Sequence, residues 1–345
     1  MHTFYDAGHN RHDPGQLLQT TTPESDLAYE IPQRATVLYE AIKAASFGPI
    51  ITPGDFGIEP IGDIHDYGML NLLQHGYRLW QEEKTPLLPL IPHTYSVRPQ
   101  SNRIPRSLWG LLGYYCFDTS TPLMAHTWDV AYWSAQTAIS AAALAYAGSQ
   151  KVAYALCRPP GHHAASNLYG GYCYLNNAAI TANWLVQQGQ RVAIVDVDYH
   201  HGNGTQEIFY GRSDVLYCSL HADPFNEYPF FWGHGDEYGE GSGLSYNFNY
   251  PLPRQTDEQL YLRALDEALS KVRLFVPDIL VISLGLDIIS GDPVGSFNLT
   301  TDILPKIGAR FGAFNLPTVV VQEGGYNIPA LGEQIVAFFN GLLGK

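Results

Sequence analysis

Five short apolar runs, rich in Val, Ile and Leu, recur along the chain, and each ends in glycine or polar side chains. Such runs are typical of parallel strands, which are buried on both faces. Helical patterns separate the runs, and this alternation indicates a parallel sheet covered by helices on both of its faces. The predicted strands are residues 152–156, 191–195, 215–220, 279–284 and 318–322. We therefore predict an α/β fold with a mostly parallel central sheet.

Apolar residues at helical spacing predict helices between these strands. The predicted helices are residues 32–45, 65–83, 128–147, about 177–188 and 257–272. We find no internal repeat, low-complexity segment or linker, so the 345 residues are predicted to form one large domain, residues 1–345.

Residues 84–112 show no regular period and carry five prolines. Proline at that density prevents helix and central strand. Loops this long in a compact domain are often functional or lie in an interface. Two interpretations of this Pro-rich loop stay open: a functional segment, or a meandering surface loop.

Composition narrows the class of protein. The formal net charge is -14, the sequence pI is near 5.3, and there is no basic run, which argues against a nucleic-acid partner. No apolar run is long enough to span a bilayer, and the N-terminus lacks a signal pattern. The cysteines form no C-x-x-C pair, which favours free thiols in a reducing compartment. We expect a cytoplasmic enzyme without a membrane partner.

The strand at 191–195 ends in the sequence DVDYHHGNG, residues 196–204. Asp198 and His200 lie two residues apart, so on an extended segment they point the same way. One D-x-H pair is more often a polar loop, but several acids and imidazoles crowd this strand end. Asp287 follows the strand at 279–284 and is the predicted third ligand. Three protein ligands with an open position are typical of catalytic zinc, whereas an iron oxygenase would use two histidines and one carboxylate.

A second polar cluster follows the strand at 152–156. His162 and His163 come after two prolines and a glycine, which hold the backbone rigid. Such a pair is a surface feature or a turn when it stands alone, but beside a metal site it supplies general acid–base groups. Asp196 can orient one ring, and the hydroxyl of Tyr326 can donate to a developing oxyanion. These roles suffice for metal-assisted amide hydrolysis.

The same residues carry a family resemblance. The motifs are RPPGHHA at 158–164, GGYCYLNN at 170–177, DVDYHHGNGTQ at 196–206, SLHADP at 219–224, LGLD and GDP within 284–293, and EGGY at 323–326. They resemble the histone deacetylase family over nearly the whole chain. Within that family the chain is most similar to the bacterial acetylpolyamine amidohydrolases, because of EGGY, the Pro-rich loop and the segment from Asn102 to Tyr115.

The resemblance implies an arginase-deacetylase fold and a zinc-dependent deacetylase. It implies zinc on Asp198, His200 and Asp287, acid–base work by His162 and His163, a carbonyl-polarising Tyr326, and a narrow tunnel flanked by Tyr172 and Tyr228. One structural potassium site is implied at Asp196, Asp198, His200, Ser219 and Leu220. A second is implied near Phe209, Arg212, Val215 and Tyr246. In the amidohydrolase subgroup, the Pro-rich loop helps to form a homodimer that narrows the mouth of the active site.

Two departures from the family pattern shape the expectations. Asn203 stands where many histone deacetylases have Asp, so His163 is expected to be less basic than His162, which Asp196 would partner. We expect His163 to be the proton shuttle and His162 the charged stabiliser. The sequences Leu108-Trp109-Gly110 and Gly15-Gln16-Leu17 stand where the polyamine enzymes carry acids. Trp109 could instead offer a cation–π contact or indicate an apolar substrate.

The predicted function is removal of an acetyl or short acyl group from a small acylated amine such as an acetylpolyamine. The alternatives are a protein acetyl-lysine deacetylase, a deacylase of aromatic or apolar small amides, and a metal-containing binding module without catalysis. The last is disfavoured because every catalytic side chain is present.

Overall fold

The computed structural model describes residues 1–15, 29–84, 89–97 and 103–345. These residues form one eight-stranded sheet with the order β2-β1-β3-β8-β7-β4-β5-β6, and every neighbouring pair is parallel. The strands are β1 (His2–Phe4), β2 (Ile50–Ile51), β3 (Val152–Ala155), β4 (Val192–Asp196), β5 (Val215–Ala222), β6 (Asn247–Leu252), β7 (Ile279–Leu284) and β8 (Thr318–Gln322). The predicted fold class is confirmed, and all five predicted strands are present.

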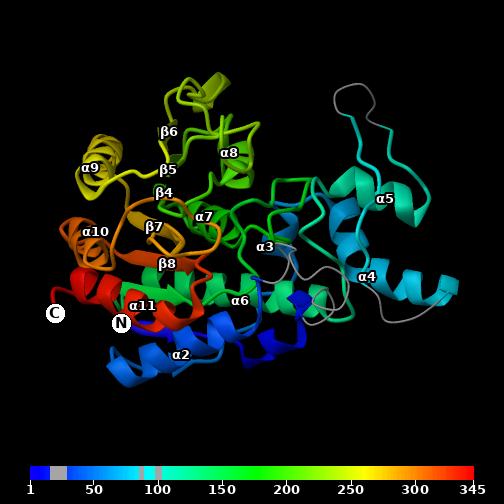
Figure 1. Cartoon of the computed structure of the whole chain (residues 1–345), viewed down its shortest axis with the longest axis horizontal. Coiled ribbons are helices and arrows are strands. Elements are labelled where there is room, and N and C mark those ends of the chain that lie inside the picture. Colours follow the sequence, from blue (N-terminus) through cyan, green and yellow to red (C-terminus); the bar gives the residue numbers. More distant parts are fainter. Residues whose placement is uncertain (16–28, 85–88, 98–102) are drawn as a thin grey trace.

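Helices lie on both faces of this sheet (Figure 1). The helices are α2 (Gln33–Ala45), α3 (Glu59–Gly62), α4 (Tyr67–Lys84), α5 (Leu108–Tyr115), α6 (Thr127–Tyr146), α7 (Asn177–Gln187), α8 (Asn203–Phe209), α9 (Glu258–Phe275), α10 (Ile303–Gly312) and α11 (Ile328–Leu343). Of these, α4 and α5 extend to one side of the sheet, at the right of Figure 1. Two short 3₁₀ segments, η1 (Ala7–Arg11) and η3 (Gly241–Gly243), also lie within the described residues. The five predicted helices correspond to α2, α4, α6, α7 and α9.

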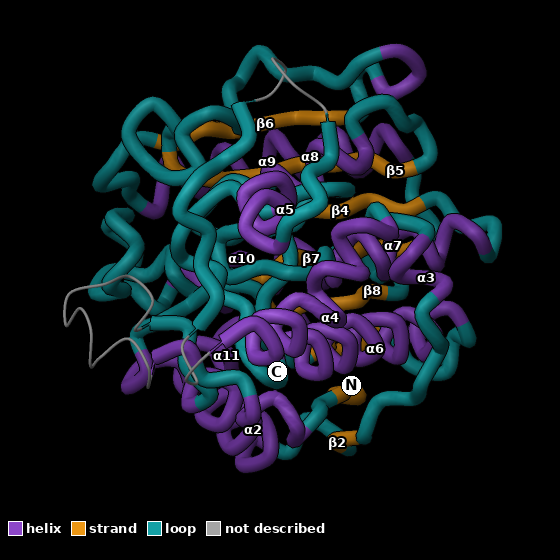
Figure 2. The backbone as a smooth tube through the Cα atoms, turned by 90° about the vertical axis from the view of Figure 1, so that its right-hand side faces the viewer, coloured by secondary structure: helices purple, strands orange, loops and turns teal. Residues whose placement is uncertain are grey.

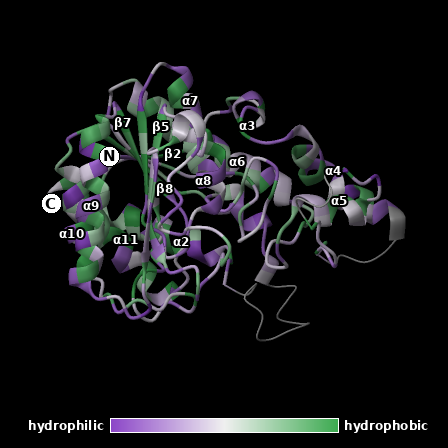
Figure 3. Ribbon diagram, turned by 90° about the horizontal axis from the view of Figure 1, so that it is seen from above, coloured by the Kyte–Doolittle hydropathy of each residue, from purple (hydrophilic) through white to green (hydrophobic). Residues whose placement is uncertain are grey.

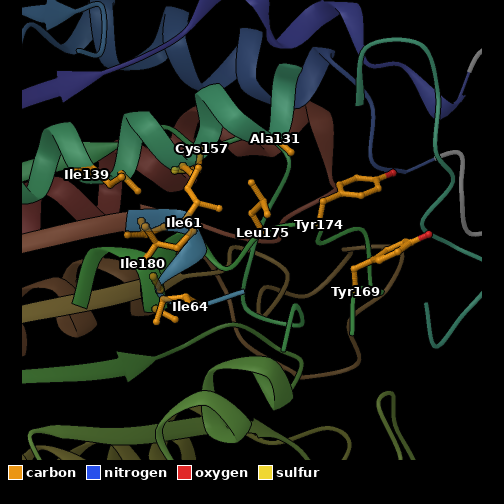
Figure 4. Close-up of a cluster of buried hydrophobic side chains, with 14 of the residues drawn as sticks. Ile61, Ile64, Ala131, Ile139, Cys157, Tyr169, Tyr174, Leu175 and Ile180 are labelled. Carbon is orange, nitrogen blue, oxygen red and sulfur yellow. The ribbon is translucent and has the colours of Figure 1, made fainter. Parts of the chain in front are cut away.

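The strand side chains divide between two hydrophobic cores, as the period of two along a strand requires. On β4, Val192 and Ile194 join the core under α6 and α7, whereas Ala193 and Val195 join the core under α2, α9, α10 and α11. Figure 2 shows the strands between these helical layers, and Figure 3 shows the apolar colouring concentrated along them. Figure 4 shows part of the first core, where Ile139 of α6 and Ile180 of α7 are buried. Burial on both faces explains why these strands read as continuous apolar runs.

Some elements were not predicted. β6 lies at the edge of the sheet and is half-exposed, and its sequence NFNYPL carries Asn and Pro, which are depleted in strands. An edge position tolerates the proline because one side of the strand needs no ladder hydrogen bond. α10 contains Pro305 in its first turn, where the missing N–H is harmless.

The Pro-rich loop differs from its prediction at its C-terminal end. α5 begins at Leu108, so the expected irregular backbone up to Leu112 is wrong for the last five residues. The side chain of Ser107 caps this helix by accepting a hydrogen bond from the backbone N–H of Gly110. Residues 85–88 and 98–102, which include Pro86 and Pro99, lie outside the described residues.

Among the described residues, none of the helices is long and apolar enough to cross a membrane.

Candidate active site

Four strands end around one pocket. The segments that follow β3, β4, β7 and β8 bring His162, His163, His200, Asp287 and Tyr326 to the same edge of the sheet, because parallel strands share their carboxyl ends. The register aligns Asp196 with Ser283 on one side and with Ser219 on the other. A pocket of about 330 Å³ opens here, and its lining includes both histidines of the pair, His200 and Tyr326.

Asp198, His200 and Asp287 form a group that could hold a metal ion, with ligand atoms within 4.8 Å of one another. Nδ1 of His200 lies 3.3 Å from Oδ1 of Asp198 and 3.3 Å from Oδ2 of Asp287. Oδ2 of Asp287 is buried and accepts no hydrogen bond from the described residues. A buried carboxylate oxygen without a donor is costly, and a cation would satisfy it.

The other carboxylate oxygens of this group have fixed partners. The backbone N–H of Gly324 donates to Oδ2 of Asp198 at 2.8 Å, and the N–H of Tyr199 donates to Oδ1 of Asp287 at 3.0 Å. A Cβ added at Gly285 would lie 2.2 Å from Oδ2 of Asp198, and one added at Gly324 would lie 2.3 Å from Oδ2 of Asp287. Two glycines therefore let the backbone close around the carboxylates. This arrangement fits a divalent ion bound by two acids and one imidazole.

The charges of this group are unbalanced without a cation. Burial raises the pKa of Asp287 to about 7, and repulsion from Asp198 adds to the effect. Burial also acts to raise the pKa of Asp198, but His162 and His200 outweigh it and hold that pKa below its usual range. Two buried acids that repel each other favour the binding of a positive ion between them.

The two histidines of the pair have different partners. Nδ1 of His162 lies 3.0 Å from Oδ2 of Asp196, and Nδ1 of His163 lies 2.7 Å from Oδ1 of Asn203. Both oxygens accept, so each Nδ1 carries a proton and each Nε2 is left for chemistry. The expected partners of the two rings are thus in place.

These partners separate the basicity of the two rings. Burial acts to lower the pKa of His162, but Asp198 and Asp196 outweigh it and raise that pKa to about 10. Burial and the neighbouring His162 hold the pKa of His163 well below its usual value. The ring centroids lie 4.1 Å apart, so a charge on one ring disfavours a charge on the other. His162 is the charged member of the pair, and His163 is the neutral one.

Tyr326 is held from two sides. The guanidinium carbon of Arg34 lies 4.4 Å from the centroid of the Tyr326 ring, and Nε of Arg34 donates to the carbonyl of Gly325 at 2.6 Å. The backbone N–H of Tyr326 donates to Oδ2 of Asp292 at 2.6 Å. These contacts fix both the ring and its backbone at the pocket.

Aromatic side chains flank the catalytic groups. The ring of Tyr172 lies 5.7 Å from that of Tyr326, and the ring of Tyr228 lies 5.0 Å from that of His163 in an edge-to-face arrangement. Both tyrosines line the pocket. The Tyr228 hydroxyl donates to Oδ2 of Asp118 at 3.0 Å.

Trp109, the third residue predicted for the tunnel, lies elsewhere within this chain. It is on α5, where its ring stacks on His93 at 4.7 Å and meets the ring of Trp80 edge-on at 5.0 Å. Trp109 is absent from the lining of the pocket. The sequence could not reveal this, because the Pro-rich loop gave no period from which to place α5. Gln16 and Leu17, where acids were expected in the polyamine enzymes, lie outside the described residues.

The residues predicted to hold potassium lie near the ends of β4 and β5. Ser219 and Leu220 are buried on β5, and the Ser219 hydroxyl lies 2.8 Å from Nδ1 of His221. At the second site, Arg212 pairs with Asp214 at 2.9 Å and stands over the ring of Phe209. Val215 and Tyr246 lie close by, because Tyr246 accepts a backbone hydrogen bond from Tyr217. Both potassium sites stay predictions.

Several buried charged residues around the site were not predicted. Glu30 accepts from Arg34 and Arg158 at 3.0 Å each, and all three side chains are buried. Glu323 is also buried, and its carboxylate faces the backbone of the histidine pair. Glu323 and Arg158 stand inside the quoted motifs, so a signal was present. Their partners are far away in the sequence, and spacing alone does not reveal such contacts.

Comparisons with known proteins agree with this geometry. A family model described as the histone deacetylase domain matches residues 28–342. Acetylpolyamine amidohydrolase 1 of Pseudomonas aeruginosa is 44% identical over 319 residues, which cover 92% of this chain and 92% of that protein. Histone deacetylase 8 of Arabidopsis thaliana is 37% identical over 232 residues, which cover 63% of this chain and 60% of that protein.

A solved structure has the same fold. The crystal structure of acetylpolyamine aminohydrolase from Burkholderia pseudomallei superposes with a TM-score of 0.92 at 42% identity, covering 99% of this chain and 98% of that chain. The resemblance predicted from the motifs is confirmed. The chain belongs to the histone deacetylase family and is a hydrolase that acts on amide bonds.

Proposed function

We propose that this chain is a zinc-dependent amidohydrolase that removes an acetyl or short acyl group from a small acylated amine, such as an acetylpolyamine. The observation that carries the proposal is the convergence of three groups on one pocket. They are the ligand set Asp198, His200 and Asp287, the two differently partnered histidines, and the Tyr326 hydroxyl.

Asp198, His200 and Asp287 would hold the zinc ion. When bound, such an ion polarises an amide carbonyl and lowers the pKa of water. Oδ2 of Asp287, which lacks a donor, and Oδ1 of Asp198 each lie 3.3 Å from Nδ1 of His200.

The remaining steps use side chains of this chain. Nε2 of the neutral His163 accepts a proton from the attacking water, because its Nδ1 proton is bound to Asn203. The positive His162, oriented by Asp196, stabilises the negative charge that develops. The Tyr326 hydroxyl donates to the carbonyl oxygen as it becomes an oxyanion. His163 then returns the proton to the leaving amine.

The pocket supports a slender substrate. Tyr172 and Tyr228 stand beside Tyr326 and His163, so an alkyl chain between the two rings would exclude water from the catalytic groups. The relatives in two bacteria bear the name acetylpolyamine amidohydrolase. Glu227 also lines the pocket and offers a carboxylate to a distal ammonium. The alternative is a protein acetyl-lysine deacetylase, for which the identity with Arabidopsis histone deacetylase 8 is the supporting observation.

A panel of acylated amines tests the proposal. Purified protein is assayed on N-acetylputrescine, N-acetylcadaverine and an acetyl-lysine peptide, before and after chelation and with zinc restored. We expect turnover of the small amines, loss with chelator, and recovery with zinc; His163→Ala serves as the inactive control. A higher kcat/KM for the peptide would favour the alternative. Absence of turnover on every acylated amine with zinc restored would refute deacylation.

The potassium sites and the homodimer belong to the same proposal. Replacing potassium with choline should lower the melting temperature if the buried carbonyls near Asp196 and Leu220 bind the ion. Light scattering at micromolar concentration should give the mass of a dimer. A monomer mass together with full activity would show that the Pro-rich loop does not narrow the mouth of the active site through a dimer.

A further inference from the structure

Glu323 is a buried carboxylate that the proposed reaction has not yet used. It follows β8 directly and precedes Gly324, Gly325 and Tyr326, and the residue is 0% exposed. It is absent from the lining of the pocket, so it does not touch a substrate held there. A buried carboxylate needs compensating donors, and the identity of these donors indicates its role.

The donors come from two other strand ends. Oε2 of Glu323 accepts from the backbone N–H of Gly161 at 2.6 Å and from that of His162 at 3.2 Å. Oε1 accepts from the Ser283 hydroxyl at 3.3 Å. Successive backbone N–H groups form an anion-binding concavity. Here the carboxylate of Glu323 fills it, so one side chain joins the segment after β3, the end of β7 and the segment after β8.

The backbone around Glu323 is fixed as tightly as its side chain. Its N–H donates to the carbonyl of Leu284 at 2.9 Å, and its carbonyl accepts from Nη2 of Arg34 at 2.6 Å. The next N–H, of Gly324, donates to Asp198. Glu323 is therefore anchored to the sheet and to the segment that carries Tyr326.

The histidine segment has little room to move on its other side. A Cβ added at Gly161 would lie 2.5 Å from the backbone nitrogen of Asn177 and 2.7 Å from the carbonyl oxygen of Leu175. The start of α7 thus lies close against this backbone, and Glu323 accepts its N–H groups. The distance of His162 and His163 from the segment after β8 therefore depends on the length of the Glu323 side chain.

A second interpretation of the same residues is a metal site formed by His162, Cys173 and Glu323, whose ligand atoms lie within 4.8 Å of one another. The contacts argue against it. Oε2 of Glu323 already accepts two N–H groups, and Nδ1 of His162 is bonded to Asp196. The Cys173 thiol donates to the carbonyl of Gly171 at 3.2 Å. Of these side chains, only His162 keeps a ligand atom, Nε2, without a hydrogen bond among the described residues, and one such atom does not make a metal site.

We propose that Glu323 is a positioning residue for amide hydrolysis: its side chain sets the distance between the histidine pair and Tyr326. The inference rests on the proposed function, because the two groups act on opposite sides of one carbonyl. A displacement of about 1 Å in such a constellation can lower the rate by about 100-fold. The role depends on the reach of the carboxylate oxygen, whereas a purely electrostatic role would depend on its charge.

Two conservative variants separate reach from charge. Glu323→Gln keeps the length, places an amide oxygen where Oε2 accepts, and turns its amino group to the Ser283 hydroxyl, which can also accept. Glu323→Asp keeps the charge but is one methylene shorter. We expect kcat on N-acetylputrescine to fall less than about 5-fold for Glu323→Gln and about 30- to 100-fold for Glu323→Asp, with KM within about 3-fold in both.

A matched pair at Glu237 supplies the control. Glu237 also accepts several donors, from Gln206 at 2.6 Å and from the backbone of Gly233 at 2.9 Å, and it is absent from the pocket lining. Glu237→Asp and Glu237→Gln should shift the melting temperature and leave kcat unchanged. The zinc content of both Glu323 variants should equal that of the unmodified protein.

The outcomes distinguish the two proposals. Glu323→Asp with kcat equal to or above that of Glu323→Gln overturns the positioning role, and so does loss of zinc from Glu323→Asp. If the unmodified protein does not deacetylate any amine, the proposed function itself fails. Should one variant not fold, a large loss of kcat in folded Glu323→Gln, or an unchanged kcat in folded Glu323→Asp, overturns the role by itself.

Discussion

The floor and the mouth of the pocket are built in different ways. We call the floor the histidine pair, Tyr326 and His200, which line the pocket, together with Asp198 and Asp287, which group with His200. We call the mouth Asn226, Glu227, Phe230, Arg254 and Val294, which also line the pocket. Floor residues are almost entirely buried, and hydrogen bonds from backbone or buried side chains hold them. At the mouth, Phe230 is 50% exposed. Arg254 forms an ion pair with Glu227, and the side chain of Arg254 is 63% exposed.

This difference separates chemistry from selectivity. Strand ends carry the floor, so its geometry follows from the sheet and leaves little freedom. Loops carry the mouth, and loops vary without disturbing the sheet. Changes at the floor should therefore act on kcat, whereas changes at the mouth should act on the choice of substrate.

The largest effect is expected at the floor from Tyr326→Phe. In the proposed reaction, the change removes the hydroxyl that donates to the developing oxyanion, and loss of such a donor lowers kcat by about 100- to 1,000-fold. The ring over Arg34 remains, so the melting temperature should stay the same. Steady-state kinetics and a thermal melt check both parts. A loss of less than about 10-fold in kcat would contradict the role of the hydroxyl.

Acid should lower the stability of the folded chain through His65, a buried histidine that bonds to the segment between the histidine pair and α7. Nδ1 of His65 lies 3.0 Å from the carbonyl of Ala165, and its Nε2 accepts from the N–H of Asn176, so the ring is neutral in the folded chain. Burial lowers its pKa to about 4 from 6.5. The unfolded state then binds more protons as the pH falls, so the contribution of His65 to the free energy of unfolding is fully present above pH 6.5 and is lost as the pH falls toward 4.

The loss from this histidine amounts to about 1.4 kcal/mol for each pH unit, or about 3 kcal/mol over the whole window. Urea unfolding at pH 7, 6 and 5 measures it. His65→Gln should flatten the slope by this amount, while His126→Gln, at a side chain that is 48% exposed, should not. Equal slopes for the unmodified protein and His65→Gln would show that the buried ring takes up protons in the folded state.

Arg254→Gln should produce a smaller effect that depends on the substrate. Arg254 forms an ion pair with Glu227 at the mouth. Without Arg254, the Glu227 carboxylate is available to pair with the distal ammonium group of a substrate. Surface ion pairs contribute up to about 1 kcal/mol, so kcat/KM for N-acetylputrescine should rise about 3- to 5-fold. The neutral analogue N-butylacetamide should not change.

A matched control is Lys306→Gln, which breaks an exposed ion pair with Glu258 away from the pocket. It should leave both substrates unaffected. If Arg254→Gln changed the cationic and the neutral substrate equally, the ion pair would act on the shape of the mouth rather than on its charge.

Phe231→Ser should have the smallest effect on small substrates. Phe231 is 77% exposed beside the mouth and is absent from the pocket lining. We expect kcat/KM for N-acetylputrescine to change less than about 2-fold, because surface substitutions of this kind shift free energies by only a few tenths of a kcal/mol. The same variant assayed on an acetyl-lysine peptide tests for contact with a larger chain. A 10-fold loss on the small amine alone would place Phe231 in the binding site.

The sequence predicts the floor better than the mouth for a physical reason. Asp198, His200 and Asp287 follow runs that could only be buried strands, and parallel strands bring their ends together. The contacts of Arg34 and Glu323 could not be predicted, because their partners lie far away in the chain and leave no periodic trace. Trp109 shows why the residues predicted for the mouth were harder to place. Its residue type fitted a cationic ligand, but its place depends on how α5 packs against α4, which no local pattern determines.

The close approach of Gly285 and Gly324 to the acids has a consequence for protein engineering. Any side chain at either position would push the carboxylate of Asp198 or Asp287 out of place, and even alanine adds the Cβ that collides. A designer who wants a new substrate should therefore leave Gly285 and Gly324 unchanged and randomise Asn226, Arg254 and Val294, which line the pocket away from these carboxylates.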